Sequence, residues 1–407
     1  MADFKTCSLD YFPENILIDI LSYLSVRELV RMGRVCKRWR RLVKDQRLWR
    51  AVDLSEWKGV TSRLLWVLLR QYFGCGLRCL HLRGLLLSAR GGAFLSESWL
   101  QTLASRCPRL RKLSLLHVDL RVLRSCLFLP PTLQVLELRG CELPPGFFSM
   151  SSSLSSTDHS GGKTGNRMGR ASSATSTTLA GSHAASSVVD TTAGGTAIET
   201  LVLDNVPSFT DLHLQSLVSW KRLSRLELRD VIRITAAGLR SCAAQESGIG
   251  GDEGPGVAFR LSQLMSLELG NSGRPGSQTQ MASLGLGEGW AGLEELTLGG
   301  REVAPGLLCV CRLKDLQRLR LRGCLLSEVQ VLRSCRGLRN LQRLEFCEVT
   351  FQGHQKKWDA KENDRHEGSE SGNEKEDPMP TLRRSLGGLL PGCTLVFTRC
   401  SVTMPSE

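Results

Sequence analysis

The sequence predicts an α/β protein in which three short N-terminal helices precede a curved solenoid of repeated strand and helix units. Three observations predict this fold. Residues 9–50 carry apolar side chains at helical spacing, a six-residue pattern with three large apolar positions then recurs along the chain, and most copies of that pattern start about 23 to 33 residues apart. Such a period allows one strand and one helix per copy.

Three runs of apolar residues within 9–50 have helical spacing. Pro13 suits the first turn of the first helix, and Ser25 and Glu28 have capping-box spacing for a second helix that starts near Val26. Gly33 separates the second run from the third. About 40 residues rarely stabilise themselves without disulfides, metal or a partner. Either the downstream domain covers this apolar surface, or one face of the trio docks onto helices of another protein.

The repeated pattern is a large apolar residue, two variable residues, Leu, one variable residue and a final Leu or Phe. A degenerate tenth strand is expected around Leu395 and Phe397. We expect helices between strands at 98–104, 210–218 and 236–243, and Cys141 and Cys324 occupy the position where leucine-rich repeats take Asn or Cys. The nine clear copies start at Leu77, Leu110, Leu133, Ile198, Leu223, Leu264, Leu293, Leu316 and Leu341.

Composition divides the chain into segments. Segments 151–195, 247–256, 271–280 and 354–380 have the composition of disordered insertions, and removing the first restores roughly one repeat between Leu133 and Ile198. The predicted segments are the helical unit 1–50, a linker helix 51–76, repeats 77–149, a Ser/Thr/Gly-rich insertion 150–196, repeats 197–353, a charged loop 354–380 and a terminal repeat and tail 381–407.

Charge and cysteine content favour a reduced compartment and a protein partner. The net charge of +13 is partly concentrated in residues 31–50, without an aromatic-rich RNA-binding signature, so we expect no nucleic-acid partner. No signal peptide or membrane span is predicted. The 15 cysteines lack paired zinc-site spacing, so we expect buried thiols and no metal or other cofactor. The expected location is cytoplasmic and nuclear. The charges of Lys37 to Arg41 are expected to form a solvated helix face, and a nuclear-localisation element is the alternative.

The N-terminal unit resembles an F-box, and the whole chain resembles F-box proteins with C-terminal leucine-rich repeats. The resemblance rests on Phe12-Pro13-Glu14, Ile16-Leu17, residues 20–24, residues 34–42 and Leu48-Trp49, with Phe12 where the family usually has Leu. It implies that the unit binds a Skp-type adaptor, which in turn attaches to a cullin and a RING subunit in an SCF ubiquitin ligase. The adaptor-binding residues expected from it are Phe12, Pro13, Glu14, Ile16, Leu17, Ile20, Leu21, Leu24, Val35, Cys36, Trp39, Leu42 and Trp49.

In such a solenoid the leucines of each strand point into the core, and the residues between and just after them face the concave surface. The expected substrate-binding positions are His81, Arg83, Lys112, Ser114, Glu137, Arg139, Val202, Asp204, Arg225, Glu227, Arg229, Glu268, Glu295, Thr297, Arg318, Arg320, Arg322, Arg343 and Glu345. Arg318, Arg320 and Arg322 form a row that could hold an acidic or phosphorylated degron. The alternative is that these charges pair across neighbouring strands and keep the face soluble.

No catalytic motif is present in the sequence. A phosphate-binding glycine loop, a zinc-protease His-Glu pair and a Gly-x-Ser-x-Gly elbow are all absent. We therefore expect a non-catalytic adaptor subunit of a ubiquitin ligase that recruits target proteins for degradation. Two other functions stay open: a leucine-rich-repeat scaffold or inhibitor that acts without a ligase, and a basic nucleic-acid binder with strongly salt-dependent binding.

Overall fold

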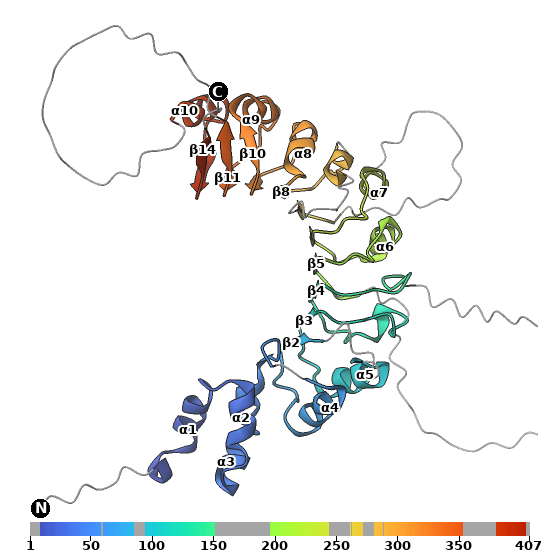
Figure 1. Cartoon of the computed structure of the whole chain (residues 1–407), viewed down its shortest axis with the longest axis vertical. Helices are drawn as coiled ribbons and strands as arrows, with labels where there is room; N and C mark the ends of the chain where they lie inside the picture. The colour runs from blue at the N-terminus through green and yellow to red at the C-terminus, as the bar shows by residue number, and fades with distance from the viewer. Residues whose placement is uncertain are drawn as a thin grey trace, which may run out of the picture.

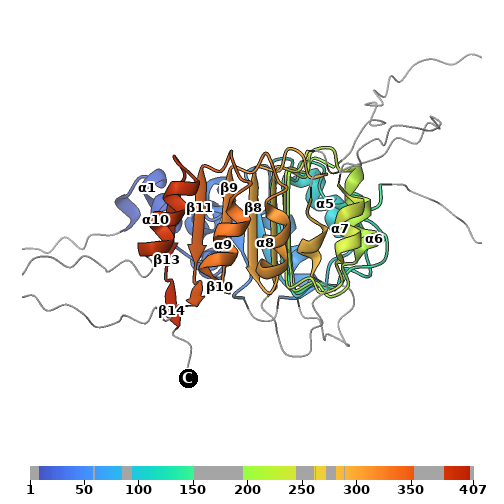
Figure 2. The ribbon, with the colours of Figure 1, turned by 90° about the horizontal axis from the view of Figure 1, so that it is seen from above.

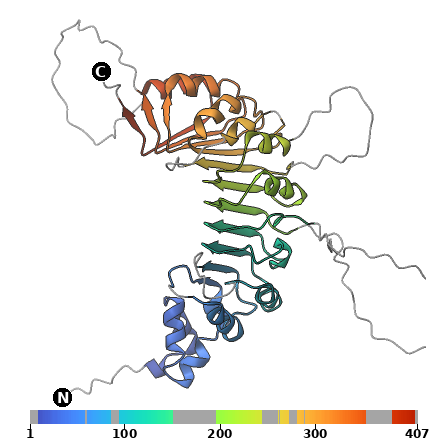
Figure 3. The ribbon, with the colours of Figure 1, turned by 45° about the vertical axis from the view of Figure 1, so that its right-hand side comes forward.

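The computed structural model describes residues 9–57, 60–84, 94–150, 196–243, 261, 263–271, 281–287, 289–352 and 380–403. These residues form a three-helix unit followed by a curved repeat array, with the strands along the inner side of the curve and the helices outside (Figure 1). Figure 3 shows the strands stacked in chain order, one above another, from the three-helix unit to the C-terminal end. This arrangement confirms the predicted α/β solenoid.

The three-helix unit has the predicted elements. Its second helix begins at Val26, as the capping-box spacing predicts, and Pro13 directly precedes the first helix. Short 3₁₀ turns flank the helices at both ends. The elements are η1 (Leu9–Tyr11), α1 (Glu14–Leu21), α2 (Val26–Met32), α3 (Lys37–Leu42) and η2 (Gln46–Trp49).

The array is built on one 11-stranded parallel sheet, in which strands follow each other in chain order. All nine clear copies of the pattern and the degenerate tenth copy are strands of this sheet. The first strand, Ala51–Asp53, was not predicted. It lies in the segment 51–76, which was expected to be only a linker helix, and it pairs with β2. The strands are β1 (Ala51–Asp53), β2 (Cys79–Arg83), β3 (Lys112–Leu116), β4 (Val135–Arg139), β5 (Thr200–Asp204), β6 (Arg225–Arg229), β7 (Ser266–Asn271), β8 (Glu295–Gly300), β9 (Arg318–Arg322), β11 (Arg343–Cys347) and β13 (Thr394–Thr398).

The pairing register places equivalent repeat positions side by side. Leu136 of β4 pairs with Leu201 of β5, although 64 residues separate them in the chain, so the interval 151–195 leaves the register unchanged. The four predicted insertions lie outside the described residues, except that Asn271 ends β7 and Pro380 begins α10.

Helices cover the outer face of the sheet, as parallel strands require a crossover between neighbours. Seen from above, α8, α9 and α10 follow one another along that outer face (Figure 2). The helices predicted at 98–104, 210–218 and 236–243 are present. The elements are α4 (Ser62–Gln71), α5 (Glu97–Arg106), η3 (Cys126–Phe128), α6 (Asp211–Ser216), η4 (Leu217–Ser219), α7 (Ala236–Ser241), η5 (Ala282–Gly285), α8 (Val303–Val310), α9 (Glu328–Cys335) and α10 (Pro380–Leu389).

The turn that follows each strand repeats along the array. Its first residue has a left-handed backbone at His117, Gly140, Asn205 and Asp230, among others. The next residue is buried at Val118, Cys141 and Val206, and the Cys141 thiol donates to the carbonyl oxygen of Leu115 on the preceding rung at 3.4 Å. A hydrogen-bonding Cys at this position explains why the repeat accepts Asn or Cys there.

The core is a continuous stack of strand leucines between the sheet and the outer helices. Leu80, Leu113, Leu136 and their counterparts on strands β5 to β11 are at most 1% exposed, while Leu395 on β13 is half-buried. A second, three-stranded parallel sheet closes the C-terminal repeats on the turn side of the main sheet. It consists of β10 (Leu325–Ser327), β12 (Thr350–Gln352) and β14 (Ser401–Thr403).

Candidate functional site

Two local hydrogen-bond patterns fix the helices of the three-helix unit. In the capping box of α2 the Ser25 hydroxyl accepts from the Glu28 amide, and the Glu28 carboxylate accepts from the Ser25 amide at 2.8 Å. The Cys36 sulfur accepts from the Trp39 amide at 3.4 Å and so caps α3. Cys36 therefore begins a helix at the surface instead of packing inside it.

Two further contacts hold α1 and α3 together. Arg41 on α3 forms an ion pair with Glu14 at the start of α1. Arg38, also on α3, donates from Nη2 to the carbonyl oxygen of Phe12 at 2.8 Å. The relative position of the two helices is thus set by polar contacts at their ends as well as by the apolar side chains between them.

Large apolar side chains are exposed on this unit. Ile16 and Ile20 lie one turn apart on α1 and are 40% and 44% exposed. Tyr23, after the same helix, is 90% exposed, and Val35, before α3, is 63% exposed. Ile16 and Ile20 share one face of α1, and exposed apolar side chains that lie together on a folded surface indicate an interaction site for another protein.

Trp49 anchors the three-helix unit to the repeat array. Its indole is completely buried and stacks on the ring of Tyr72, which directly follows α4, with centroids 4.6 Å apart. The indole nitrogen also donates to the Val43 carbonyl oxygen at 2.6 Å. The exposed apolar side chains of the unit are therefore held in a fixed position relative to the strands of the array.

The concave face of the array carries charged side chains in columns that run across the strands. Glu137, Glu227, Glu268 and Glu345 occupy the middle position of their strands and are buried. Arginines from the flanking positions cover them. The ion pairs join Lys112 and Arg139 to Glu137, Arg225 and Arg229 to Glu227, Arg229 and Arg322 to Glu268, Arg225 and Arg318 to Glu295, and Arg320 and Arg343 to Glu345.

These ion pairs favour the charged form of Glu137 and Glu345. Burial alone would raise the pKa of Glu137, but the hydrogen bond and charge of Lys112 hold that pKa below its ordinary value. Burial likewise opposes ionisation of Glu345, and the hydrogen bonds from Arg320 and Arg343 outweigh it, so the pKa of Glu345 is also lowered. The hydrogen bond to Glu268 in turn raises the pKa of Arg229.

Comparison with known proteins shows the family of the chain. Residues 9–55 match the model of the F-box-like family. The chain is 30% identical to human F-box/LRR-repeat protein 12 over 349 residues. This aligned region covers 84% of this chain and 89% of the human protein. The chain belongs to the F-box/LRR-repeat protein family. The mouse F-box/LRR-repeat protein 12 is also 30% identical and the bovine one 28% identical, with the same coverage.

Burial corrects part of the predicted adaptor-binding set in the F-box. Leu17, Leu21, Leu42 and Trp49 are at most 3% exposed. They pack in the core of the folded chain, so their part in adaptor binding stays a prediction, and the structure places them behind the exposed side chains of the unit. The helical spacing placed them on an apolar face, but it could not separate the side of α1 that faces α3 from the side that faces solvent.

The other predicted adaptor-binding residues reach the surface at least in part. Pro13, Glu14, Ile16, Ile20, Val35 and Cys36 are exposed, while Phe12, Leu24 and Trp39 are half-buried. Tyr11 and Tyr23, 87% and 90% exposed, are further candidates that the sequence analysis did not include. Both lie beside the apolar run of α1, so the sequence signal for them was an aromatic residue next to each end of that run.

The predicted substrate-binding residues fall on the concave face, but their ion pairs change the interpretation of the arginine row. Arg318, Arg320 and Arg322 lie on one strand as predicted, and each contacts a carboxylate, of Glu295, Glu345 and Glu268 respectively. An acidic ligand must displace these carboxylates before it can bind the row. Pairing across strands, the alternative considered from the sequence, is what the charges of this row do.

Towards the N-terminal end of the concave face, three of the predicted residues form no ion pair with a described residue. Arg83 is exposed and His81 is half-buried on β2, and Asp204 on β5 is half-buried. The register places Asp204 between Arg139 and Arg229 on the neighbouring strands. These residues leave this end of the face more open to a ligand than the glutamate-rich strands that follow.

Six cysteines of the described chain are shielded from solvent. Burial raises the pKa of Cys107, Cys126, Cys141 and Cys242 to about 11, and that of Cys324 and Cys335 to about 12. Thiols with such values stay protonated near neutral pH and are poor nucleophiles and metal ligands. Among the described residues no group of His, Cys, Asp and Glu side chains could hold a metal ion. None of the described helices combines the length and apolar character that a membrane crossing requires.

Proposed function

We propose that this chain is the substrate-recognition subunit of an SCF-type E3 ubiquitin ligase. Its F-box binds a Skp-type adaptor and through it, indirectly, a cullin and a RING subunit. Its leucine-rich repeats hold a target protein for ubiquitination and proteasomal degradation in the cytoplasm or nucleus. The chain itself contributes binding and positioning, and the transfer chemistry belongs to other subunits.

The observation that carries this proposal is the exposed apolar surface of the F-box. Ile16, Ile20, Tyr23 and Val35 are all at least 40% exposed, whereas Leu17 and Leu21 on α1 face inward. Burying such side chains stabilises a complex by about 25 cal/mol per Å² of apolar surface removed from water. A helical partner that covers this surface, as the F-box family implies, accounts for its composition.

The rigid connection between F-box and repeats fits the same role. Trp49 and Gln46 join the F-box to the array, since the Gln46 side chain donates to the Tyr72 carbonyl oxygen at 3.2 Å and accepts from the Gly76 amide at 3.3 Å. Ubiquitin transfer requires a target lysine to be held at a defined distance from the rest of the ligase, and a stiff receptor provides that proximity.

Copurification tests the proposal on the full chain. We expect a Skp-type adaptor to copurify with the unmodified chain and to be lost from a double variant, Ile20→Glu with Tyr23→Asp, because charged side chains would enter the apolar interface. The matched control is Leu212→Glu, which adds a charge at a 73% exposed position on α6. Leu17→Ala is unsuitable because Leu17 is buried, so this change would destabilise the F-box itself.

The result that would reject the ligase function is a well-folded chain that fails to bind the adaptor, or a double variant that binds it as well as the unmodified chain does. In that case the alternative is a leucine-rich-repeat scaffold or inhibitor that uses the same concave face without a ligase. Comparing the ubiquitinated proteins that copurify with the unmodified chain and with the double variant separates the two functions further.

A further inference from the structure

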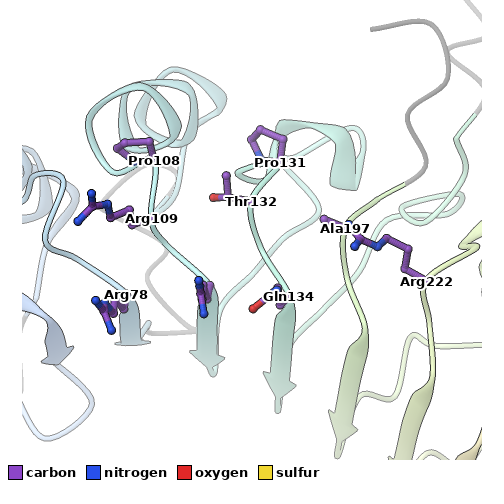
Figure 4. A pocket seen from close by; sticks show the side chains of 9 residues that line it. Arg78, Pro108, Arg109, Pro131, Thr132, Gln134, Ala197 and Arg222 are labelled. Atoms are coloured by element: carbon purple, nitrogen blue, oxygen red, sulfur yellow. The ribbon is translucent and has the colours of Figure 1, made fainter.

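A cavity of about 600 Å³ lies at the edge of the sheet where strands β2 to β6 begin (Figure 4). Four arginines line it: Arg78, Arg109, Arg111 and Arg222. In Figure 4, Arg78 and Arg109 lie at one end and Arg222 at the other, with Thr132 and Gln134 between them. We call this cavity, with its four arginines, the arginine groove.

The repeat geometry brings these arginines together. Arg78 directly precedes β2 and Arg111 directly precedes β3, and the Arg111 amide donates to the Arg78 carbonyl oxygen at 2.8 Å. They therefore stand on neighbouring rungs, about 4.8 Å apart along the sheet. Arg109 and Arg222 occupy equivalent positions of the turns before β3 and β6, two residues further from their strands.

The groove differs from the concave face in the pairing of its charges. None of its four arginines forms an ion pair with a carboxylate in the described chain, and no acidic residue is among those that line it. On strands β6 to β11 of the concave face each arginine has a glutamate partner. A candidate for a carboxylate partner is Glu199, whose amide donates to the Gln134 carbonyl oxygen, but Glu199 does not line the groove.

The basic character is local to this half of the edge. A second cavity, of about 530 Å³, lies along the same edge near the C-terminal repeats. There Glu294 and Asp315 accompany Arg339, and the Asp315 carboxylate accepts from the Gly292 amide at 3.0 Å. The repeat architecture therefore does not itself require unpaired arginines at this edge.

We propose that the arginine groove binds a phosphorylated segment of a client protein. Guanidinium groups bind phosphate oxygens through paired, charge-assisted hydrogen bonds, and neighbouring rungs let Arg78 and Arg111 share one phosphate or hold two. Thr132 and Gln134 lie between the arginine ends. The Thr132 hydroxyl already donates to the Leu110 carbonyl oxygen at 2.9 Å and can only accept from a peptide, whereas the Gln134 side-chain amide adds a neutral donor and acceptor.

The composition of the groove favours a phosphopeptide over a nucleic acid. Proteins that bind single-stranded nucleic acid add aromatic side chains on which bases stack. The residues that line the groove include no aromatic side chain, and its apolar walls are Pro108, Pro131 and Ala197. This inference adds a class of substrate to the proposed function. It rests on that function only in taking the bound phosphoprotein to be a substrate of the ligase, because the binding itself requires no adaptor.

Fluorescence polarisation on the full chain tests the inference. The probe is a short labelled peptide with several phosphoserines, compared with its unphosphorylated form. The chain is first treated with phosphatase, so that phosphate on its own Ser/Thr-rich segment 151–195 cannot occupy the groove. We expect the phosphorylated probe alone to bind, and the double variant Arg78→Glu with Arg111→Glu to bind it at least about tenfold more weakly, a difference of about 1.4 kcal/mol.

Arg339→Glu is the matched control, because it reverses a charge on the same edge beside the mixed-charge cavity. It should leave binding of the probe unchanged, and thermal unfolding should show that both variants are folded. Equal binding by the double variant, or no binding of the phosphorylated probe, overturns the inference. Equally tight binding of a single-stranded RNA with the same sensitivity to Arg78 and Arg111 overturns it as well, because the groove would then select for charge alone.

Adaptor copurification is measured on the same samples. A chain that binds the adaptor but not the phosphopeptide refutes only the arginine groove. A chain that binds the phosphopeptide but not the adaptor refutes only the ligase function.

Discussion

The indole of Trp49 and the phenol ring of Tyr72 stack at 4.6 Å between their centroids, with the ring planes inclined by 26°. Phe73 packs against the same indole at 6.1 Å. This aromatic contact joins the last turn of the F-box to the end of α4. The two surfaces that we propose for the adaptor and the client are thereby supported by one continuous hydrophobic core.

Replacing Trp49 by Ala should destabilise the whole chain. The side chain is completely buried and also donates a hydrogen bond to Val43, so its loss creates a cavity and leaves a carbonyl oxygen unpaired. Losses of about 3 to 5 kcal/mol in the free energy of unfolding are typical of buried Trp→Ala changes. Chemical denaturation measures this loss. Tyr23→Ala, at a 90% exposed position, is the control and should change it by no more than about 0.5 kcal/mol.

Two Gly→Ala changes should have opposite effects on stability. At Gly285 an added Cβ would lie 2.4 Å from the Ala236 carbonyl oxygen and 2.7 Å from the Leu239 Cβ, so the backbone must shift, at a cost of about 1 to 3 kcal/mol. At Gly387, inside α10, the Cβ would meet open space, and Ala should stabilise the helix by about 1 kcal/mol. Unfolding midpoints that move in the same direction would contradict this assignment.

Stability should fall as acid protonates Glu137 and Glu345 on the concave face. Their ion pairs hold the pKa of both carboxyl groups below the ordinary value in the folded chain. The stabilisation is therefore present above the unfolded pKa, about 4.3, and is lost as the pH falls through the folded pKa. In Glu345→Gln the decrease in unfolding free energy below about pH 5 should be shallower than in the unmodified chain.

Glu56→Gln is the control for the pH prediction. Glu56 is exposed and forms no ion pair with a described residue, so the pH dependence of this variant should match that of the unmodified chain. A pH dependence of Glu345→Gln that is the same as in the control would mean that the ion pairs of Glu345 contribute nothing to stability.

Cysteine labelling should divide into two classes. Exposed Cys36, Cys75 and Cys311 should react with iodoacetamide near neutral pH in the folded chain. Cys107 and Cys141 should react only after unfolding, because they are buried and burial raises their pKa to about 11. Mass spectrometry after timed labelling, with and without denaturant, measures both classes. Labelling of Cys141 at the rate of Cys36 in the folded chain would contradict the described packing.

Much of the fold was predictable because the core residues of each repeat recur at fixed positions in the sequence. The leucine pattern located ten strands of the main sheet, and the Ser25 and Glu28 spacing located the start of α2. Strand β1 was missed because Ala51–Asp53 has only Val52 pointing into the core, which is too short a signal for periodicity. The three strands of the small C-terminal sheet were missed because each has only three residues and at most one of them is buried.

The sites were harder to predict because they depend on neighbours that are distant in sequence. Spacing alone placed Leu17 and Ile20 on one apolar helix, but only packing against α3 shows which of them remains exposed. Spacing also identified Arg322 without its partner Glu268, which lies two strands away and is within reach because Gly299 intervenes without a side chain. Arg78 and Arg111 were overlooked because they precede the pattern, outside the positions that define it.

The direct pairing of Leu136 with Leu201 also has a consequence for engineering. Since β4 and β5 stay in register whatever the chain does between Met150 and Thr196, this junction is a natural position for grafting. A reporter domain inserted there would leave the leucine stack uninterrupted and would emerge beside Ala197, at the rim of the arginine groove. The chain between β4 and β5 can therefore also change in length during evolution while the pairing of the solenoid strands is kept.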